Sequence, residues 1–162
     1  LRLSREVHVD SKTMSALHRL KASLPEGSTQ PDSMDDTLLL LGVTYREGQK
    51  FGFDYEMDKE DLARILKSVR QGKLNSDFLV VSIHSHEPGS WSEEPANFLP
   101  ELARFLVDAG AEVIVSGCTE IPLAITESHI DKTRIIDPTL VLARALIHHV
   151  APEKLAIIKE IS

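Results

Sequence analysis

Two histidines, His84 and His86, stand two residues apart in the stretch SIHSHEPG, directly after an apolar run of strand length. Alternate side chains of an extended chain face the same side, so both imidazoles can approach one ion. Neutral imidazole is a common ligand of transition metals, and we therefore expect a divalent metal, Mn²⁺ or Zn²⁺, as the candidate cofactor. The adjacent Glu87 is a candidate third ligand or a group that orients a ligand.

The same pattern has a second interpretation, in which both are loop histidines bonded to backbone or water. Two histidines also fall short of the roughly three protein ligands that a catalytic zinc keeps. The remaining histidines have no spacing that would complete a site; they are His8, His18, His129, His148 and His149.

The only cysteine, Cys118, lies where another apolar run ends and a short helix is expected to begin. Backbone N–H groups and the positive end of the helix dipole favour a thiolate there, so Cys118 is a candidate catalytic group. Thr119 is a candidate substrate-binding residue for a carboxylate, and Glu120 is a candidate catalytic residue that tunes the thiol. The alternative, a buried structural cysteine, is the commoner role of a lone cysteine.

Apolar and amphipathic segments that alternate along the chain are expected to position these residues. Asp10 and Asp58 are placed to cap two helices, and Gly72 and Gly110 are placed to end two. The expected strands are 4–9, 37–43, 51–56, 77–84, 112–117 and 133–137, and the expected helices are 11–24, 59–71, 95–109 and 138–149, with a short helix after Glu120.

This alternation indicates an α/β fold, a layered sandwich with a mainly parallel or mixed central sheet flanked by helices. The apolar runs 37–43, 77–84 and 112–117 are typical of strands covered on both faces. Ligands of such sheets bind beyond the carboxyl ends of the strands, so the histidine pair and Cys118 should meet at one edge. The length of 162 residues predicts a single domain, 1–162.

Composition excludes several classes of protein. The formal net charge is −7 and no basic stripe is present, so we expect no nucleic-acid partner. No apolar run approaches the ~20 residues of a membrane span. A single cysteine excludes an internal disulfide and permits a reducing cytoplasm. Residues 1–4 carry no targeting signal and no initiator methionine, which suggests a piece of a longer protein; exposed sheet edges would favour a homo-oligomer.

Residues 76–115 carry an apolar strand, Ser-Ile-His, a nearby Glu, and a helix that ends in Asp-Ala-Gly-Ala. This pattern resembles the CapA family of poly-γ-glutamate capsule-biosynthesis proteins, and the resemblance covers about residues 1–115. It implies a metallophosphatase-like, calcineurin-type α/β fold in which His84 is a metal ligand or close to one. The Gly-Asp and Asn-Asn-His motifs of that family do not occur here, and 116–120 replaces its Gly-His-His-Pro-His motif.

Residues 112–150 carry Gly-Cys-Thr-Glu-Ile-Pro-Leu, then Ile-Asp-Pro-Thr and a Leu-Ala-Arg helix. This set resembles the C-terminal part of the aspartate/glutamate racemase family. The resemblance implies that Cys118 is one of two catalytic thiols that act on the α-carbon of an acidic amino acid without a cofactor. Thr119 would then bind the substrate carboxylate. The second thiol of that mechanism has no counterpart, because Cys118 is the only cysteine.

The two resemblances divide the chain into a CapA-like segment, 1–111, and a racemase-like segment, 112–162. Such a junction suggests a chimera, natural or engineered, or a fragment with an incomplete active site. Three functions are therefore expected as alternatives. They are a CapA-like capsule-biosynthesis protein of metallophosphatase type, a racemase-like acid/base enzyme for a small acidic substrate, and a catalytically silent α/β scaffold.

Overall fold

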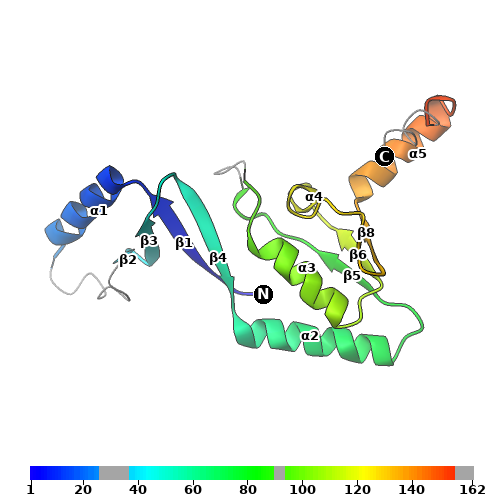
Figure 1. The fold of residues 1–162 in the computed structure, drawn as a ribbon, viewed down its shortest axis with the longest axis horizontal. Coiled ribbons are helices and arrows are strands. Elements are labelled where there is room, and N and C mark those ends of the chain that lie inside the picture. Colours follow the sequence, from blue (N-terminus) through cyan, green and yellow to red (C-terminus); the bar gives the residue numbers. More distant parts are fainter. Residues whose placement is uncertain (26–36, 90–93, 156–162) are drawn as a thin grey trace. The chain divides into compact units, whose positions relative to one another are not determined.

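The computed structural model describes residues 1–25, 37–89 and 94–155 (Figure 1). The chain divides into two compact units, each formed by two stretches of the sequence. The first comprises Leu1–Ile65 and Glu87–Phe98, and the second comprises Leu66–His86 and Leu99–Ser162. Each unit contains one four-stranded sheet of mixed strand direction.

The first unit is built on a sheet with the strand order β2-β3-β1-β4. Strand β1 pairs in parallel with β3 and antiparallel with β4. Helix α1 (Ser11–Ser23) follows β1. The strands are β1 (Leu3–Val9), β2 (Thr37–Leu40), β3 (Val43–Glu47) and β4 (Gly52–Met57). The core of this unit is formed by Val7, Val9, Met14, Leu38 and Leu40, with Leu17, Leu24, Val43, Tyr45 and Phe53 packed around them.

The single strand expected over 37–43 is wrong, because the chain reverses direction inside that apolar run. Leu41 and Gly42 both adopt positive φ values, 51° and 79°, and connect β2 to the antiparallel β3. Positive φ at both central residues is the signature of a two-residue hairpin turn. Leu41 is 76% exposed and Gly42 is also exposed, so the run supplies a mostly buried strand and an exposed two-residue turn rather than seven buried positions.

Helix α1 begins where the sequence predicts, because Asp10 caps it. The Asp10 carboxylate accepts a hydrogen bond from the Thr13 N–H at 2.7 Å, which satisfies one of the free donors of the first turn. We expect Asp10→Ala to lower the free energy of unfolding by about 1 kcal/mol. Urea denaturation measures the loss. Asp10→Asn keeps an acceptor and should cost less, and an equal loss in both variants would contradict the capping role.

Helix α2 (Lys59–Leu74) connects the two units and belongs in part to each. The expected cap is confirmed, since Asp58 accepts from the Asp61 N–H at 2.9 Å. The expected end at Gly72 is wrong, because the helix continues to Leu74. A side chain at Gly72 would lie 3.2 Å from Leu79 Cδ1, so this glycine serves close packing rather than helix termination.

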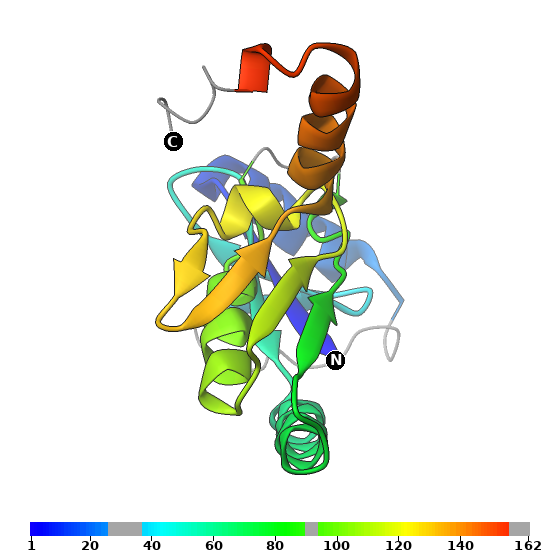
Figure 2. The ribbon, with the colours of Figure 1, turned by 90° about the vertical axis from the view of Figure 1, so that its right-hand side faces the viewer.

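The second unit is built on a sheet with the strand order β5-β6-β8-β7 (Figure 2). Strands β5, β6 and β8 are parallel, and the two-residue β7, which the sequence did not predict, is the antiparallel edge. The strands are β5 (Val80–Ile83), β6 (Val113–Ser116), β7 (His129–Ile130) and β8 (Thr133–Ile136), and the helices are α3 (Phe98–Asp108), α4 (Ile121–Ala124) and α5 (Pro138–Val150).

Helix α3 covers one face of this sheet, and among the described residues Figure 2 shows no helix over the opposite face. The buried side is mostly apolar. The helix and sheet bury two polar residues, Ser116 and Thr133, and the apolar residues Ile83, Phe98, Leu99, Leu102, Ala103, Leu106, Ile114 and Ile135. The expectation that 77–84 is covered on both faces is therefore wrong. Phe78 is 60% exposed and Val80 is 50% exposed, because in the part of the chain that the structure describes one helix, α3, covers this sheet.

The expected α/β class is confirmed, with mixed sheets and helices that alternate along the chain. The expected single central sheet is replaced by two four-stranded sheets, one in each unit. Among the helices of the described residues, none has the length and apolar content needed to cross a membrane.

Glu112 links the start of β6 to its neighbours in the second unit. Its carboxylate lies 2.9 Å from Lys73 Nζ and accepts a hydrogen bond from the Leu79 N–H at 2.9 Å. The Lys73 ammonium first, and the Leu79 N–H next, hold the pKa of Glu112 below its ordinary value of 4.5. A carboxyl group with a lowered pKa in the folded state stabilises the fold above its unfolded pKa, and this stabilisation disappears as the pH falls through the lowered value.

We therefore expect Glu112→Gln to flatten the acid side of the stability curve. The wild-type protein should lose stability as the pH falls below about 4.5, and the variant should lose less over the same interval. Urea unfolding at a series of pH values from 7 to about 3 measures both curves. Parallel curves for the two proteins would show that Glu112 contributes no such linkage.

Candidate functional site

The carboxyl ends of β5 and β6 meet at one edge of the second sheet, as the sequence predicts. The two strands pair in parallel, and Ile83 at the end of β5 is in register with Ser116 at the end of β6. The segments that follow, 84–86 and 117–120, therefore emerge side by side. We call these two segments together the strand-end site.

The turn after α3 sets the start of β6 and hence the position of Cys118. Gly110 has a φ of 106°, as expected for a glycine that ends a helix. The Gly110 N–H donates to Val107 O and the Ala111 N–H donates to Leu106 O. This pair of bonds is the Schellman arrangement, which satisfies the last carbonyls of α3 and turns the chain into the next strand. The predicted C-cap is thus confirmed.

Gly117 brings the two strand ends into close contact. Its N–H donates to Ile83 O at 2.7 Å. A Cβ atom at this position would lie 2.6 Å from the same oxygen and 3.1 Å from Ser82 Oγ, which is closer than atoms can approach without displacement. Glycine is therefore the residue type that allows the Cys118 turn to approach the His84 segment.

Cys118 is half buried and contacts the backbone between the two histidines. Its thiol donates to Ser85 O at 2.8 Å, and Sγ lies 3.4 Å from the Ser85 backbone N–H, which donates to it. Both contacts join the two segments of the strand-end site. The thiol thus has a positioning role in the folded chain, whatever chemistry it also performs.

The two predicted histidines lie close together and one of them reaches the second segment. The ring centroids of His84 and His86 are 4.6 Å apart with an edge-to-face orientation. His86 Nδ1 lies 3.5 Å from Glu120 Oε1. The His86 side chain is 73% exposed and His84 is also exposed, so both imidazoles are accessible to an ion or a substrate.

The polar groups around Glu120 favour the charged form of its carboxyl group. Its own backbone N–H, and next the Cys118 thiol, hold the pKa of the Glu120 carboxyl below its ordinary value of 4.5, and Thr119 and His86 act in the same direction. Thr119 Oγ1 donates to Glu120 Oε2 at 3.1 Å. His86 therefore lies beside this carboxylate and His84 lies next to His86, but the ligand atoms of the three side chains do not all come within 4.8 Å of one another.

Glu87, the third candidate ligand, belongs to the other unit. Its carboxylate accepts a hydrogen bond from the Tyr55 hydroxyl at 2.7 Å. Burial first, and the Glu87 carboxylate next, raise the pKa of Tyr55 above its ordinary value of 10.0. The structure thus gives Glu87 a defined partner within the first unit.

His8, which the sequence analysis placed in no site, lies in a group of candidate metal ligands. Within the described residues, the group of three metal-ligating side chains whose ligand atoms all lie within 4.8 Å of one another is Glu6, His8 and Asp54. Glu6 and His8 alternate on β1 as the predicted histidine pair does after β5, and the same alternation would have identified them. Asp54 could not be anticipated, because it comes from another strand, β4.

Comparison with known proteins relates the chain to one family. A family model described as "Bacterial capsule synthesis protein PGA_cap" matches residues 8–136, which include Cys118 and extend across the expected junction at 111. Two uncharacterized proteins of Sinorhizobium fredii (strain NBRC 101917 / NGR234), y4sH and y4uA, are each 45% identical over 115 residues. The match covers 71% of this chain and 25% of each relative, so the chain spans about a quarter of the length of these curated relatives.

Proposed function

The chain belongs to the PGA_cap family of bacterial capsule synthesis proteins, and on this premise we propose that its strand-end site binds a divalent metal for the hydrolysis of an ester substrate. His84 and His86 would hold Mn²⁺ or Zn²⁺, and Glu120 would complete or orient this ligand set. The bound metal would supply Lewis acidity and lower the pKa of a bound water. The resemblance to CapA proteins implies a role in poly-γ-glutamate capsule formation, with an acidic substrate.

The observation that carries this proposal is the His86–Glu120 contact of 3.5 Å between the two segments. A carboxylate beside a metal-binding imidazole fixes the ring orientation and increases its basicity as a ligand. The lowered pKa of Glu120 keeps that carboxylate charged at neutral pH. The exposure of both histidines leaves room for water and substrate.

The chain supplies two imidazoles and one carboxylate at this edge, and we propose that this is one part of a larger metal centre. The Gly-Asp and Asn-Asn-His motifs expected of a CapA protein do not occur among the 162 residues. Such a partial centre would bind metal more weakly than a complete one, because each missing ligand removes one metal–protein bond.

Removal of the histidine pair tests the proposal. We expect Mn²⁺ to stimulate the hydrolysis of a generic phosphate ester, and we expect His84→Ala/His86→Ala to reduce the stimulated rate at least about 10-fold. His148→Ala/His149→Ala is the matched control, since it removes a second exposed pair, at the end of α5, and should leave the rate unchanged. Absence of bound metal and of stimulation in the wild-type protein would favour a catalytically silent scaffold.

Acid/base chemistry at Cys118 is a second candidate, and the influence of the Cys118 thiol on Glu120, whose pKa it helps to lower, favours it. A single thiol could exchange the α-proton of aspartate or glutamate with solvent, and proton NMR in deuterium oxide measures this exchange. Cys118→Ser keeps a donor for Ser85 O, so it separates the chemistry of the thiol from its positioning role. Exchange that is unchanged in Cys118→Ala would reject this candidate.

A further inference from the structure

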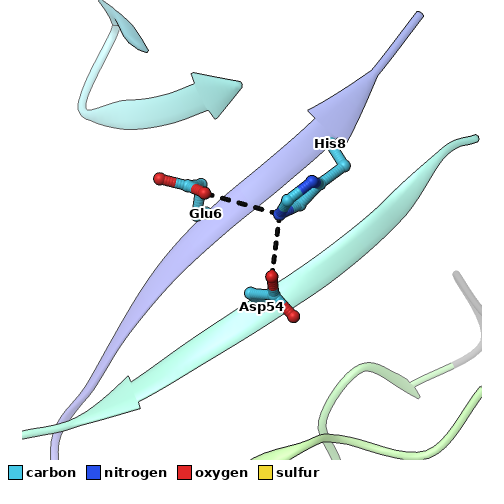
Figure 3. Close-up of side chains that lie close together, drawn as sticks. All are labelled: Glu6, His8 and Asp54. Atoms are coloured by element: carbon cyan, nitrogen blue, oxygen red, sulfur yellow. Dashed lines mark ion pairs between the residues drawn. The ribbon is translucent and has the colours of Figure 1, made fainter. Parts of the chain in front are cut away.

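Three side chains of the first unit converge between β1 and β4 (Figure 3). His8 Nε2 lies 2.9 Å from Asp54 Oδ2 and 3.4 Å from Glu6 Oε1. We call Glu6, His8 and Asp54 the β1–β4 triad. It is formed within one unit and shares no residue with the strand-end site.

The strand pairing determines this convergence. Glu6 and His8 are two residues apart on β1 and therefore face the same side of the sheet. Asp54 on β4 stands directly opposite Glu6. The position opposite His8 is Gly52, which has no side chain to fill the space beside the imidazole. Register and a small residue together leave His8 Nε2 facing the two carboxylates, as Figure 3 shows.

His8 Nε2 is a buried atom that has no hydrogen-bond partner. The two carboxylate oxygens are close enough for ion pairing, but neither meets the geometry of an N–H···O hydrogen bond. A buried polar atom without a hydrogen bond lowers the stability of the fold. Natural structures retain such an atom chiefly where a ligand, water or ion bonds to it.

The distances within the triad suit a metal ion. Bonds of roughly 2.0–2.2 Å from zinc to imidazole nitrogen and carboxylate oxygen place neighbouring ligand atoms about 3.0–3.5 Å apart. The separations of His8 Nε2 from Asp54 Oδ2 and Glu6 Oε1, 2.9 and 3.4 Å, correspond to this spacing, and the ligand atoms of all three residues lie within 4.8 Å of one another. Asp54 is 57% exposed, so its side chain can adjust, and the open side leaves positions for water.

The charges around the triad favour a cation. Glu6 and Asp54 contribute two negative charges, and Arg46 offsets one of them through hydrogen bonds of 2.6 and 3.1 Å to the two oxygens of Glu6. This pairing also holds the Glu6 carboxylate in place. One negative charge remains beside the imidazole of His8. The triad thus offers a cation one nitrogen and two oxygen donors.

We propose that the β1–β4 triad is a binding site for a divalent transition-metal cation of the Zn²⁺ or Mn²⁺ type. His8 Nε2, Glu6 Oε1 and Asp54 Oδ2 are the ligand atoms, and water fills the remaining positions. The cation joins β1 to β4 on one face of the sheet and gives the buried Nε2 of His8 a bonding partner.

Zinc binding in a protein without the strand-end histidines tests this site separately from the proposed function. In the full chain with His84→Ala/His86→Ala, equilibrium dialysis should find one bound Zn²⁺, and zinc should raise the melting temperature. Addition of Asp54→Asn should weaken binding at least about 10-fold and remove the thermal shift. Glu56→Gln is the matched control, because Glu56 is an exposed carboxylate two residues further along β4.

The outcomes distinguish a metal site from an ion pair. Because Asp54 is 57% exposed, Asp54→Asn should fold, and circular dichroism confirms this. Loss of zinc binding in Asp54→Asn but not in Glu56→Gln supports the triad. Absence of zinc binding in the His84→Ala/His86→Ala background, or equal binding by both carboxylate variants, would overturn the site and leave an ion pair only. Neither outcome depends on whether the strand-end site is active.

Discussion

Replacement of Gly117 with alanine is expected to separate the ends of β5 and β6 and to disrupt the strand-end site. The added Cβ would lie 2.6 Å from Ile83 O, so the Gly117–Ile83 hydrogen bond of 2.7 Å must lengthen or break. Overpacking of this kind costs about 1–3 kcal/mol. We expect a decrease of that size in the free energy of unfolding, measured by urea denaturation. The His86–Glu120 contact should also be lost, because Glu120 follows the displaced residue by three positions.

Gly52→Ala is the matched control for this experiment. Gly52 is the first residue of β4, and nothing lies within 4 Å of a Cβ placed there. Its replacement should change the free energy of unfolding by less than about 1 kcal/mol, since alanine restricts the unfolded chain without a clash. If Gly117→Ala were as well tolerated as Gly52→Ala, the close approach of the two strand ends would not be a requirement of the fold.

Ile114→Ala is expected to produce the largest loss of stability. Ile114 is fully buried on β6, which lies between β5 and β8 in the sheet covered by α3. Truncation of a fully buried isoleucine removes apolar contacts and leaves a cavity, at a cost of about 2–5 kcal/mol. Urea denaturation followed by circular dichroism measures this loss. Because β6 leads directly into Gly117 and Cys118, weakened metal binding at the strand-end site should accompany it.

Val80→Ala provides the comparison on the same sheet. Val80 lies on the neighbouring strand β5 and is 50% exposed on the face that α3 does not cover. Its truncation should cost less than about 1 kcal/mol, because no cavity forms at a half-exposed position. Equal losses from Ile114→Ala and Val80→Ala would contradict a core confined to the α3 side of this sheet.

Features of the fold that depend on local chemistry could be predicted from the sequence. Asp10 and Asp58 cap helices because a carboxylate three residues before a free N–H can reach it, and Gly110 ends α3 because glycine tolerates a positive φ. The hairpin at Leu41 was not predictable, since leucine rarely adopts a positive φ and the surrounding run is uniformly apolar. The exposure of Val80 depends on the number of layers over the sheet, which no local pattern reports.

In the strand-end site, too, the general arrangement could be predicted from the sequence and the individual contacts could not. The meeting of the His84 and Cys118 segments follows from parallel strand order, and the registered pair Ile83–Ser116 bears this out. The particular contacts do not follow from it: Cys118 bonds to the backbone of Ser85, and His86 rather than His84 reaches Glu120. The β1–β4 triad was not predicted, because Asp54 joins it through strand pairing with Glu6 across a long stretch of chain.

A zinc titration of the full chain with ¹⁵N-labelled histidine rings tests most directly whether the strand-end site binds metal. The proposed function predicts that the ring resonances of His84 and His86 shift together and saturate together, while those of His148 and His149 do not move. A shift of the His8 ring reports the β1–β4 triad separately. Zinc saturation without any change at His84 and His86 would contradict the account of the strand-end site.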